Sequence, residues 1–212
     1  MSAAAQRYWD ATAATLSFTH PLDFAWLAEL PRDARILDHG CGYGRTLAEL
    51  AAAGWTNTVG VDFAAAMIER GRREHPRLDL RLVDARPLDE PDGAFDAAIL
   101  FAVLTCIPGD GEQRALMAEL RRLIRPGGLL YLSDYPLQTD ARNVARYEAG
   151  AARHGVYGVW DRDDGGVFRH HAREALDAAM EGFELVAERD IASVTMSGSP
   201  ATVTQRLGRR VG

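Results

Sequence analysis

The most informative absence in this 212-residue sequence is lysine, because all 24 basic residues are arginine. Without lysine the chain cannot form the Schiff base on which pyridoxal-phosphate enzymes depend. It also cannot supply the lysine that a phosphate-binding P-loop places on its nucleotide. The composition therefore excludes two large classes of enzyme.

Cysteine is nearly as scarce, since Cys41 and Cys106 are the only two. Neither belongs to a C-x-x-C pair, and neither has histidines at the spacing of a zinc site. Two such thiols do not make a disulfide framework either. We therefore expect both cysteines to be small packing residues, and the sequence indicates no metal site.

Long hydrophobic runs and an excess of positive charge are also missing. The longest apolar run, residues 97–104, is too short to cross a bilayer, and the first ten residues lack the apolar core of a signal peptide. The net charge is -6, which disfavours a nucleic acid or an anionic membrane as the main partner. We expect a cytoplasmic protein, and the sequence leaves its oligomeric state open.

The sequence is organised around a buried strand that turns sharply into a helix. Apolar Ile36 and Leu37 lead to Asp38, and a helical apolar pattern follows three alternating glycines at positions 40, 42 and 44. Glycine suits a turn with positive φ that a ligand approaches closely. A dinucleotide-binding loop would need its third glycine at Arg45, so the pattern here is D-x-G-x-G-x-G. A tight turn that merely packs an α/β core is the alternative.

Strands and helices alternate after this loop, which predicts an α/β fold with a parallel sheet covered on both faces. In such sheets ligands bind beyond the carboxyl ends of the strands. The expected strands are residues 36–38, 58–61, 78–83, 97–101 and 129–132, with helices after the glycine loop and over residues 64–74 and 113–124.

Two segments fall outside this alternation, within a chain that we treat as one domain over residues 1–212. Residues 1–33 form an N-terminal helical extension, which we expect to break at His20-Pro21 and to resume as a helix over 22–30. Residues 135–171 form an insertion after the fifth strand, composed of a helix over 141–152 and a hairpin whose strands include 155–160 and 167–171. A helix over 173–180 and two last strands, 183–192 and 201–207, complete the chain.

Acids at the strand ends suit an adenosine. Asp62 stands 20 residues after Gly42, where a carboxylate can accept two hydrogen bonds from a ribose diol. Asp84, at the end of the next strand, can accept from an adenine amino group. Each acid also has a plainer interpretation as a helix cap or a surface acid, and capping by Asp62 is compatible with ribose binding.

Taken together, these motifs resemble class I S-adenosylmethionine-dependent methyltransferases at five places in order. The likeness is firm from Arg35 to Asp134 and looser over the two last strands. It implies a Rossmann-like sheet, mostly parallel with a C-terminal antiparallel hairpin, helices on both faces and a lid insertion after the fifth strand. The five places are the glycine loop, Val59-Gly-Val-Asp62 with Met67, Asp84-Ala85, residues 95–104 and residues 120–128.

The resemblance also implies which residues hold S-adenosylmethionine. The glycine loop lies along its methionine part, and Arg45 is a reasonable partner for its carboxylate. Asp62 takes the ribose hydroxyls, and the backbone after the fourth strand faces the amino group. The full expected set is Asp38, Gly40, Cys41, Gly42, Gly44, Arg45, Asp62, Phe63, Met67, Asp84, Ala85, Leu100 and Phe101.

The insertion carries the side chains from which an acceptor pocket can be built. His170 and His171 are the candidates for a general base, because histidine titrates near neutral pH. On a strand they point to opposite faces, so at most one faces the pocket; a structural histidine is the alternative. Arg146 and Arg169 are candidates to pair with an acidic substrate group, and pairing with nearby acids is the alternative. We expect residues 195–199 to line the far wall of the pocket. The expected substrate-binding residues are Tyr8, Tyr147, Tyr157, Trp160 and Arg169.

The sequence therefore predicts a methyltransferase that acts on an oxygen, nitrogen or sulfur atom of a small-molecule acceptor. The whole chain is similar to compact bacterial methyltransferases with the same insertion, a likeness that names no acceptor. Two alternatives stay open: an oxidoreductase that binds a nicotinamide dinucleotide, disfavoured by Arg45, and a non-catalytic S-adenosylmethionine-binding protein.

Overall fold

The computed structural model describes residues 3–83 and 87–212, and its centre is a seven-stranded sheet of order β3-β2-β1-β4-β5-β9-β8. The first five strands run parallel, whereas β9 is antiparallel to β5 and β8 is antiparallel to β9. This arrangement confirms the predicted fold class. The strands are β1 (Ile36–His39), β2 (Thr58–Asp62), β3 (Asp79–Leu82), β4 (Phe95–Phe101), β5 (Ile124–Asp134), β8 (Phe183–Val194) and β9 (Pro200–Arg210).

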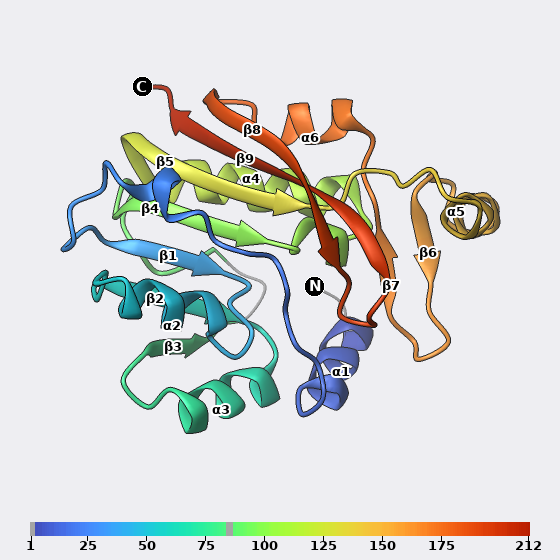
Figure 1. Cartoon of the computed structure of the whole chain (residues 1–212), viewed down its shortest axis with the longest axis horizontal. Coiled ribbons are helices and arrows are strands. Elements are labelled where there is room, and N and C mark those ends of the chain that lie inside the picture. Colours follow the sequence, from blue (N-terminus) through green and yellow to red (C-terminus); the bar gives the residue numbers. More distant parts are fainter. Residues whose placement is uncertain (1–2, 84–86) are drawn as a thin grey trace.

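Helices cover both faces of this sheet, as Figure 1 shows. On one face, Leu120 and Leu123 of α4 and Leu176 of α6 pack on the strands. On the other, Leu27 of η1 and Leu50 of α2 pack on the central strands. Because both faces are covered, β4 is a nearly continuous apolar run. The helices named here are η1 (Phe24–Leu27), α2 (Arg45–Ala52), α3 (Ala65–Glu74), η2 (Leu104–Cys106), α4 (Asp110–Leu123) and α6 (Arg173–Ala179).

The insertion after β5 has the expected composition of a helix followed by a hairpin. Helix α5 (Ala141–His154) begins at Asp140, whose carboxylate accepts the Asn143 backbone N–H. Strands β6 (Val159–Asp161) and β7 (Val167–Arg169) form a separate two-stranded sheet. At Gly150 an added Cβ would lie 1.8 Å from the Val159 carbonyl oxygen, so only glycine lets α5 lie this close to β6.

The N-terminal extension is less helical than expected. Helix α1 (Ala3–Thr12) ends well before His20, and the predicted helix over 22–30 shrinks to the four residues of η1. The Asp23 carboxylate caps η1 through the Ala25 N–H, whereas burial of Leu27 and Leu30 in the core holds the segment against the sheet. Tertiary packing therefore overrides the apolar spacing that suggested a longer helix.

Helix α1 is attached to α3, far from it in sequence. The Asp10 carboxylate accepts the Ala66 N–H at 3.0 Å in the first turn of α3. Arg70 of α3 donates to the carbonyl oxygens of Ala13 and Leu16 at 2.9 and 2.8 Å. These contacts hold α1 beside the carboxyl ends of the parallel strands (Figure 1). Within the described part of the chain, no helix combines the length and apolar content needed to cross a bilayer.

Candidate functional site

A cavity of about 840 Å³ lies at the carboxyl ends of the parallel strands. Its floor is the glycine loop and the ends of β2 and β4, and its walls come from the N-terminal extension, the insertion and the turn between β8 and β9. Figure 1 shows these segments gathering at the same end of the sheet. The volume is typical of a site that encloses a small molecule.

The glycine loop bends because its glycines adopt positive φ, which is +79° at Gly40 and +54° at Gly42. The backbone N–H groups of Gly40 and Cys41 both donate to the Val61 carbonyl. The Gly42 N–H donates to the Asp62 carboxylate at 2.8 Å. These loop amides are thus paired within the protein.

Phe18 lies directly on this loop, a contact that the sequence did not predict. A Cβ added at Gly42 would lie 2.2 Å from the Phe18 ring. The same ring stacks on Tyr43 with centroids 5.2 Å apart. Gly42 is therefore needed for close approach of an aromatic side chain as well as for the turn.

Asp62 joins the glycine loop to the residue before α3 and also faces the cavity. One carboxylate oxygen accepts the Gly42 N–H, and the other accepts the Ala64 N–H at 2.8 Å just before α3. Burial raises the pKa of this carboxyl, and these backbone hydrogen bonds act against the shift. Since Asp62 also lines the cavity and a carboxylate has about four acceptor positions, it retains capacity for a ribose diol.

Asp38 is a buried acid of the cavity floor with one unpaired carboxylate oxygen among the described residues. Its side chain is buried at the cavity floor, and its Oδ2 has no hydrogen-bond partner among the described residues. Burial raises its pKa to about 7, and the nearby Arg45 acts against this shift. A buried carboxylate oxygen without a partner is costly, so the ammonium group of an amino acid would suit this position.

Arg45 extends along the cavity wall from the first residue of α2. Its guanidinium donates at 2.5 Å both to Glu49 and to the backbone carbonyl of His20, whereas its Nε is buried without a partner. Arg45 thereby joins the N-terminal extension to the glycine loop. Its expected pairing with a cofactor carboxylate stays a prediction.

The other expected cofactor residues divide into three groups. Cys41, Phe63, Met67 and Phe101 line the cavity. Gly44 packs on Leu78 and Leu80 instead, and Leu100 is buried in the core, so the structure places neither at the cavity. The predictions for Asp84 and Ala85 lie outside the described residues.

Ala102, two residues after Leu100, lies at the cavity beyond the end of β4. It lines the cavity with φ of +54°, a conformation uncommon for a residue other than glycine. Its N–H donates to the Ser133 carbonyl at 2.7 Å, and its carbonyl accepts the Cys106 thiol. Strained backbone of this kind is concentrated at functional sites.

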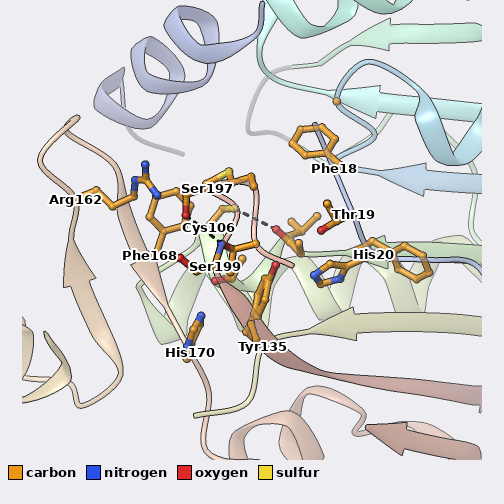
Figure 2. A pocket seen from close by; sticks show the side chains of 18 of the residues that line it. Phe18, Thr19, His20, Cys106, Tyr135, Arg162, Phe168, His170, Ser197 and Ser199 are labelled. Atoms are coloured by element: carbon orange, nitrogen blue, oxygen red, sulfur yellow. Dashed lines mark hydrogen bonds between the residues drawn. The ribbon is translucent and has the colours of Figure 1, made fainter. Parts of the chain in front are cut away.

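Beyond the glycine loop, two histidines face the cavity on either side of one tyrosine (Figure 2). The Tyr135 ring meets His20 edge-on with centroids 4.8 Å apart and stacks on His170 at 5.0 Å. Burial raises the pKa of Tyr135 far above its usual value. The three rings form a row, which we call the His20–Tyr135–His170 row.

His20 presents an unused ring nitrogen to the cavity. Its Nδ1 lies 2.9 Å from the Ser133 hydroxyl, and its Nε2 is buried without a partner in the described structure. Burial lowers its pKa to about 4, while a hydrogen bond with the Ser133 backbone carbonyl acts against the shift. We assign the ring proton to Nδ1, beside Ser133, and the lone pair to Nε2, which has no partner among the described residues.

His170 is oriented in the opposite sense. Its Nδ1 lies 2.5 Å from the Tyr147 hydroxyl, whose other possible acceptor, Asn143 Oδ1, is 3.4 Å away. We therefore assign the Tyr147 hydroxyl as the donor to Nδ1 of His170, its nearer partner. Nδ1 then accepts, and the ring proton of His170 is on Nε2. Burial lowers the pKa of His170 to about 2, so at neutral pH the ring is an uncharged donor.

His171 points away from the cavity, as expected of one histidine in the pair. Its Nε2 lies 2.9 Å from Gln113 Nε2, and its Nδ1 is 3.8 Å from the Asp134 carboxylate. Burial lowers the pKa of His171 to about 4 and raises that of Asp134 to about 7. Of the two histidines named as candidate bases, the structure therefore places His170 at the cavity and His171 behind its wall.

Of the five expected substrate-binding residues, only Trp160 lines the cavity. Tyr147 is fully buried behind His170, and half-exposed Tyr157 packs edge-on against it. Tyr8 packs against Phe168, and Arg169 is held by Asp110 at 2.5 Å. These four residues support the wall rather than form its surface.

The sequence did not identify the N-terminal part of the acceptor wall. Phe18, Thr19 and His20 line the cavity together with Tyr135, although His20 was considered only as a place where a helix breaks. The position of Tyr135 directly after the acid that ends β5 was the one available signal. Thr195, Met196, Ser197 and Ser199 line the far wall, as predicted.

Comparison with known proteins adds a family to this geometry. A family model described as a methyltransferase domain matches residues 36–128. The chain is 30% identical over 204 residues to the 27-O-demethylrifamycin SV methyltransferase of Amycolatopsis mediterranei (strain S699), covering 89% of this chain and 69% of that protein. The chain spans between about half and 69% of the length of the first curated relatives it matches.

Solved structures share the fold at low sequence identity. A SAM-dependent methyltransferase from Methanosarcina mazei has a TM-score of 0.84 at 22% identity, covering 91% of this chain and 99% of that one. The 1,6-didemethyltoxoflavin-N1-methyltransferase of Burkholderia thailandensis, solved with S-adenosylhomocysteine, has a TM-score of 0.62 at 20% identity, covering 98% and 79%. At these identities the likeness is evidence for the fold alone.

Proposed function

Because the chain belongs to the class I S-adenosylmethionine-dependent methyltransferases, we propose that it methylates an oxygen, nitrogen or sulfur atom of a small molecule bound in the cavity. The observation that carries this proposal is the division of the cavity. One half has the loop and strand-end acids that suit the cofactor, and the other has the His20–Tyr135–His170 row and Trp160.

In the cofactor half, the chain's own residues bind and orient. Asp38 accepts a hydrogen bond from the amino group, Asp62 accepts from the ribose hydroxyls, and Arg45 is placed for the carboxylate. S-adenosylmethionine supplies an electrophilic methyl group when bound, so the protein's task is placement of the acceptor. Holding two reactants in line can contribute about 7–11 kcal/mol to lowering the barrier.

The acceptor half is suited to a small planar molecule. Aromatic side chains from three segments line it, and they exclude water from the place where the nucleophile must sit. The Burkholderia relative of similar fold was solved with 1,6-didemethyltoxoflavin. That precedent supports a small-molecule acceptor here without identifying it.

His20 is the better placed of the two cavity histidines to accept a proton. Its Nε2 has a lone pair and no partner among the described residues, whereas the Nε2 of His170 carries the ring proton. A hydroxyl acceptor needs such a base, while an amine or a thiolate does not. His20 therefore accepts from the nucleophile, and His170 donates to another group of the acceptor.

Transfer from labelled S-adenosylmethionine to a panel of phenols, amines and thiols tests the proposal. We expect methylated product from at least one small-molecule class, with His20→Gln lowering kcat by about 100-fold for a hydroxyl acceptor and leaving cofactor affinity unchanged. Calorimetry with S-adenosylmethionine and with NAD should give binding of the first only. Tight cofactor binding without transfer to any class would instead favour a non-catalytic binding protein.

A further inference from the structure

Arg146, in the insertion, faces the cavity without a carboxylate partner among the described residues. Arg146 of α5 lines the cavity, and its Nε is buried without a hydrogen-bond partner. In the described structure no acid lies within ion-pair distance of its guanidinium. Its neighbour Asp140 is used instead to cap α5, with both carboxylate oxygens on Asn143.

Arg142 of the same helix also lines the cavity, but it is exposed and donates to the Ser199 hydroxyl at 2.9 Å, and the remaining arginines of the insertion pair with acids. Arg153 pairs with Asp161 at 2.9 Å, Arg162 with Asp164 at 2.7 Å, and Arg169 with Asp110. Asp161 and Asp164 are exposed at the cavity rim and have these cations beside them. The acids of the rim therefore do not neutralise Arg146.

Packing fixes the Arg146 guanidinium where a ligand can meet it. The group stacks over the Trp160 ring at 3.7 Å from the centroid. Burial lowers its pKa, and contact with the Tyr147 hydroxyl acts against that shift. A guanidinium that is half desolvated and stacked on an indole has its fork of N–H donors held in one plane, which matches a carboxylate.

His170 adds a second donor beside it. Both groups pack on Trp160, since the Arg146 guanidinium lies 3.7 Å from the centre of its ring and His170 meets the ring edge-on with centroids 4.5 Å apart. Since Tyr147 holds His170 Nδ1, the Nε2–H is left for a ligand. A cation and a neutral N–H donor then face the same end of the acceptor half.

Resting on the proposed function, we infer that Arg146 and His170 bind a carboxylate on the acceptor, so that the substrate is a planar aromatic acid. The nucleophile lies at the opposite end of the row, near His20 and the glycine loop, because Arg45 joins His20 to that loop. The carboxylate is therefore a binding group and is not the atom methylated. The methylated atom is separated from it by the length of the aromatic ring.

The test compares binding of matched acids and amides to the protein saturated with S-adenosylhomocysteine. The probes are 4-hydroxybenzoate and 4-hydroxycinnamate with their primary amides, titrated by calorimetry. We expect the wild type to bind at least one acid about 10-fold or more tightly than its amide, the range for a charged hydrogen bond. Arg146→Gln should abolish this preference, and Arg146→Lys should restore only part of it because the fork is lost.

Arg153→Gln is the matched control, since Arg153 lies on the same helix, does not line the cavity and already pairs with an acid, Asp161. It should keep the acid preference, and all variants should bind S-adenosylhomocysteine as the wild type does. The inference would be overturned if the wild type bound acid and amide with equal affinity, or bound neither acid. It would also be overturned if Arg146→Gln lowered the affinity for acid and amide by the same factor. Methylation of neutral acceptors in those cases would leave the proposed function standing, whereas acid-selective binding without any transfer would contradict the function alone.

Discussion

The carboxylate of Asp62 accepts the backbone N–H of Gly42 at 2.8 Å, which joins the end of β2 to the middle of the glycine loop. The same side chain accepts the backbone N–H of Ala64, the residue before α3. One acid thus holds the loop in shape while facing the cavity. Its replacement should affect both the cofactor and the fold.

Asp62→Ala should weaken S-adenosylmethionine binding by about 1–3 kcal/mol, because two ribose hydroxyls and the Gly42 N–H lose their acceptor. The melting temperature should fall as well, since the N–H groups of Gly42 and Ala64 lose a buried acceptor. Calorimetric titration and thermal unfolding measure the two effects. Asp92→Ala removes an exposed acid paired with Arg122 and should change neither; unchanged affinity in Asp62→Ala would contradict the assignment.

Cofactor affinity should depend on pH through Asp38. Burial raises its pKa to about 7 in the free protein, and a bound ammonium group would favour the ionised carboxylate and lower that pKa. Affinity for S-adenosylmethionine should therefore rise as pH increases towards 7 and level off above it. Asp38→Asn should bind more weakly at pH 7.5 and show a flatter profile; identical profiles would separate Asp38 from the cofactor.

The raised pKa of Asp38 should also make the free energy of unfolding fall as pH rises. Between about pH 4 and 7 the unfolded carboxyl is ionised, whereas the folded one holds its proton. The contribution of Asp38 to the free energy of unfolding is thus present at low pH and is lost as pH rises through 7. The stability difference between the wild type and Asp38→Asn, followed by urea unfolding across this range, should decline with pH.

The adjacent histidines should separate cleanly by mutation. His170→Ala should lower kcat/KM for the acceptor, mainly by raising its KM, because the Nε2–H of His170 faces the cavity. Cofactor affinity should stay nearly intact. His171→Ala should leave the acceptor KM unchanged and lower the free energy of unfolding by about 1–3 kcal/mol, because it removes the buried partner of Gln113. Steady-state kinetics and urea unfolding distinguish the two, and a kinetic effect confined to His171→Ala would refute this division.

The contact between α5 and β6 should tolerate no side chain at Gly150. An added Cβ would meet the Val159 carbonyl oxygen at 1.8 Å, so Gly150→Ala should displace the insertion and weaken acceptor binding. We expect a loss of about 1–3 kcal/mol in stability from overpacking. Gly111→Ala, where nothing lies within 4 Å of the new Cβ in α4, should be neutral or stabilise by up to about 1 kcal/mol.

The sequence by itself determined the sheet and the cofactor half. Alternating apolar segments predicted parallel strands covered on both faces, and the D-x-G-x-G-x-G loop with Asp62 located their carboxyl ends. These features are local, because a strand, a turn and a helix are encoded by neighbouring residues. Asp38, Asp62 and Met67 were all named from the sequence, and the structure places all three at the cavity.

Only the tertiary structure decided the acceptor half, where residues distant in sequence meet. It brought His20 to Tyr135, put Tyr147 behind His170 rather than in the cavity, and paired Arg169 while leaving Arg146 without an acid. Residue type alone does not distinguish a side chain that lines a cavity from one that supports its wall. That difference depends on which long-range contacts form, and those follow from packing of the whole chain.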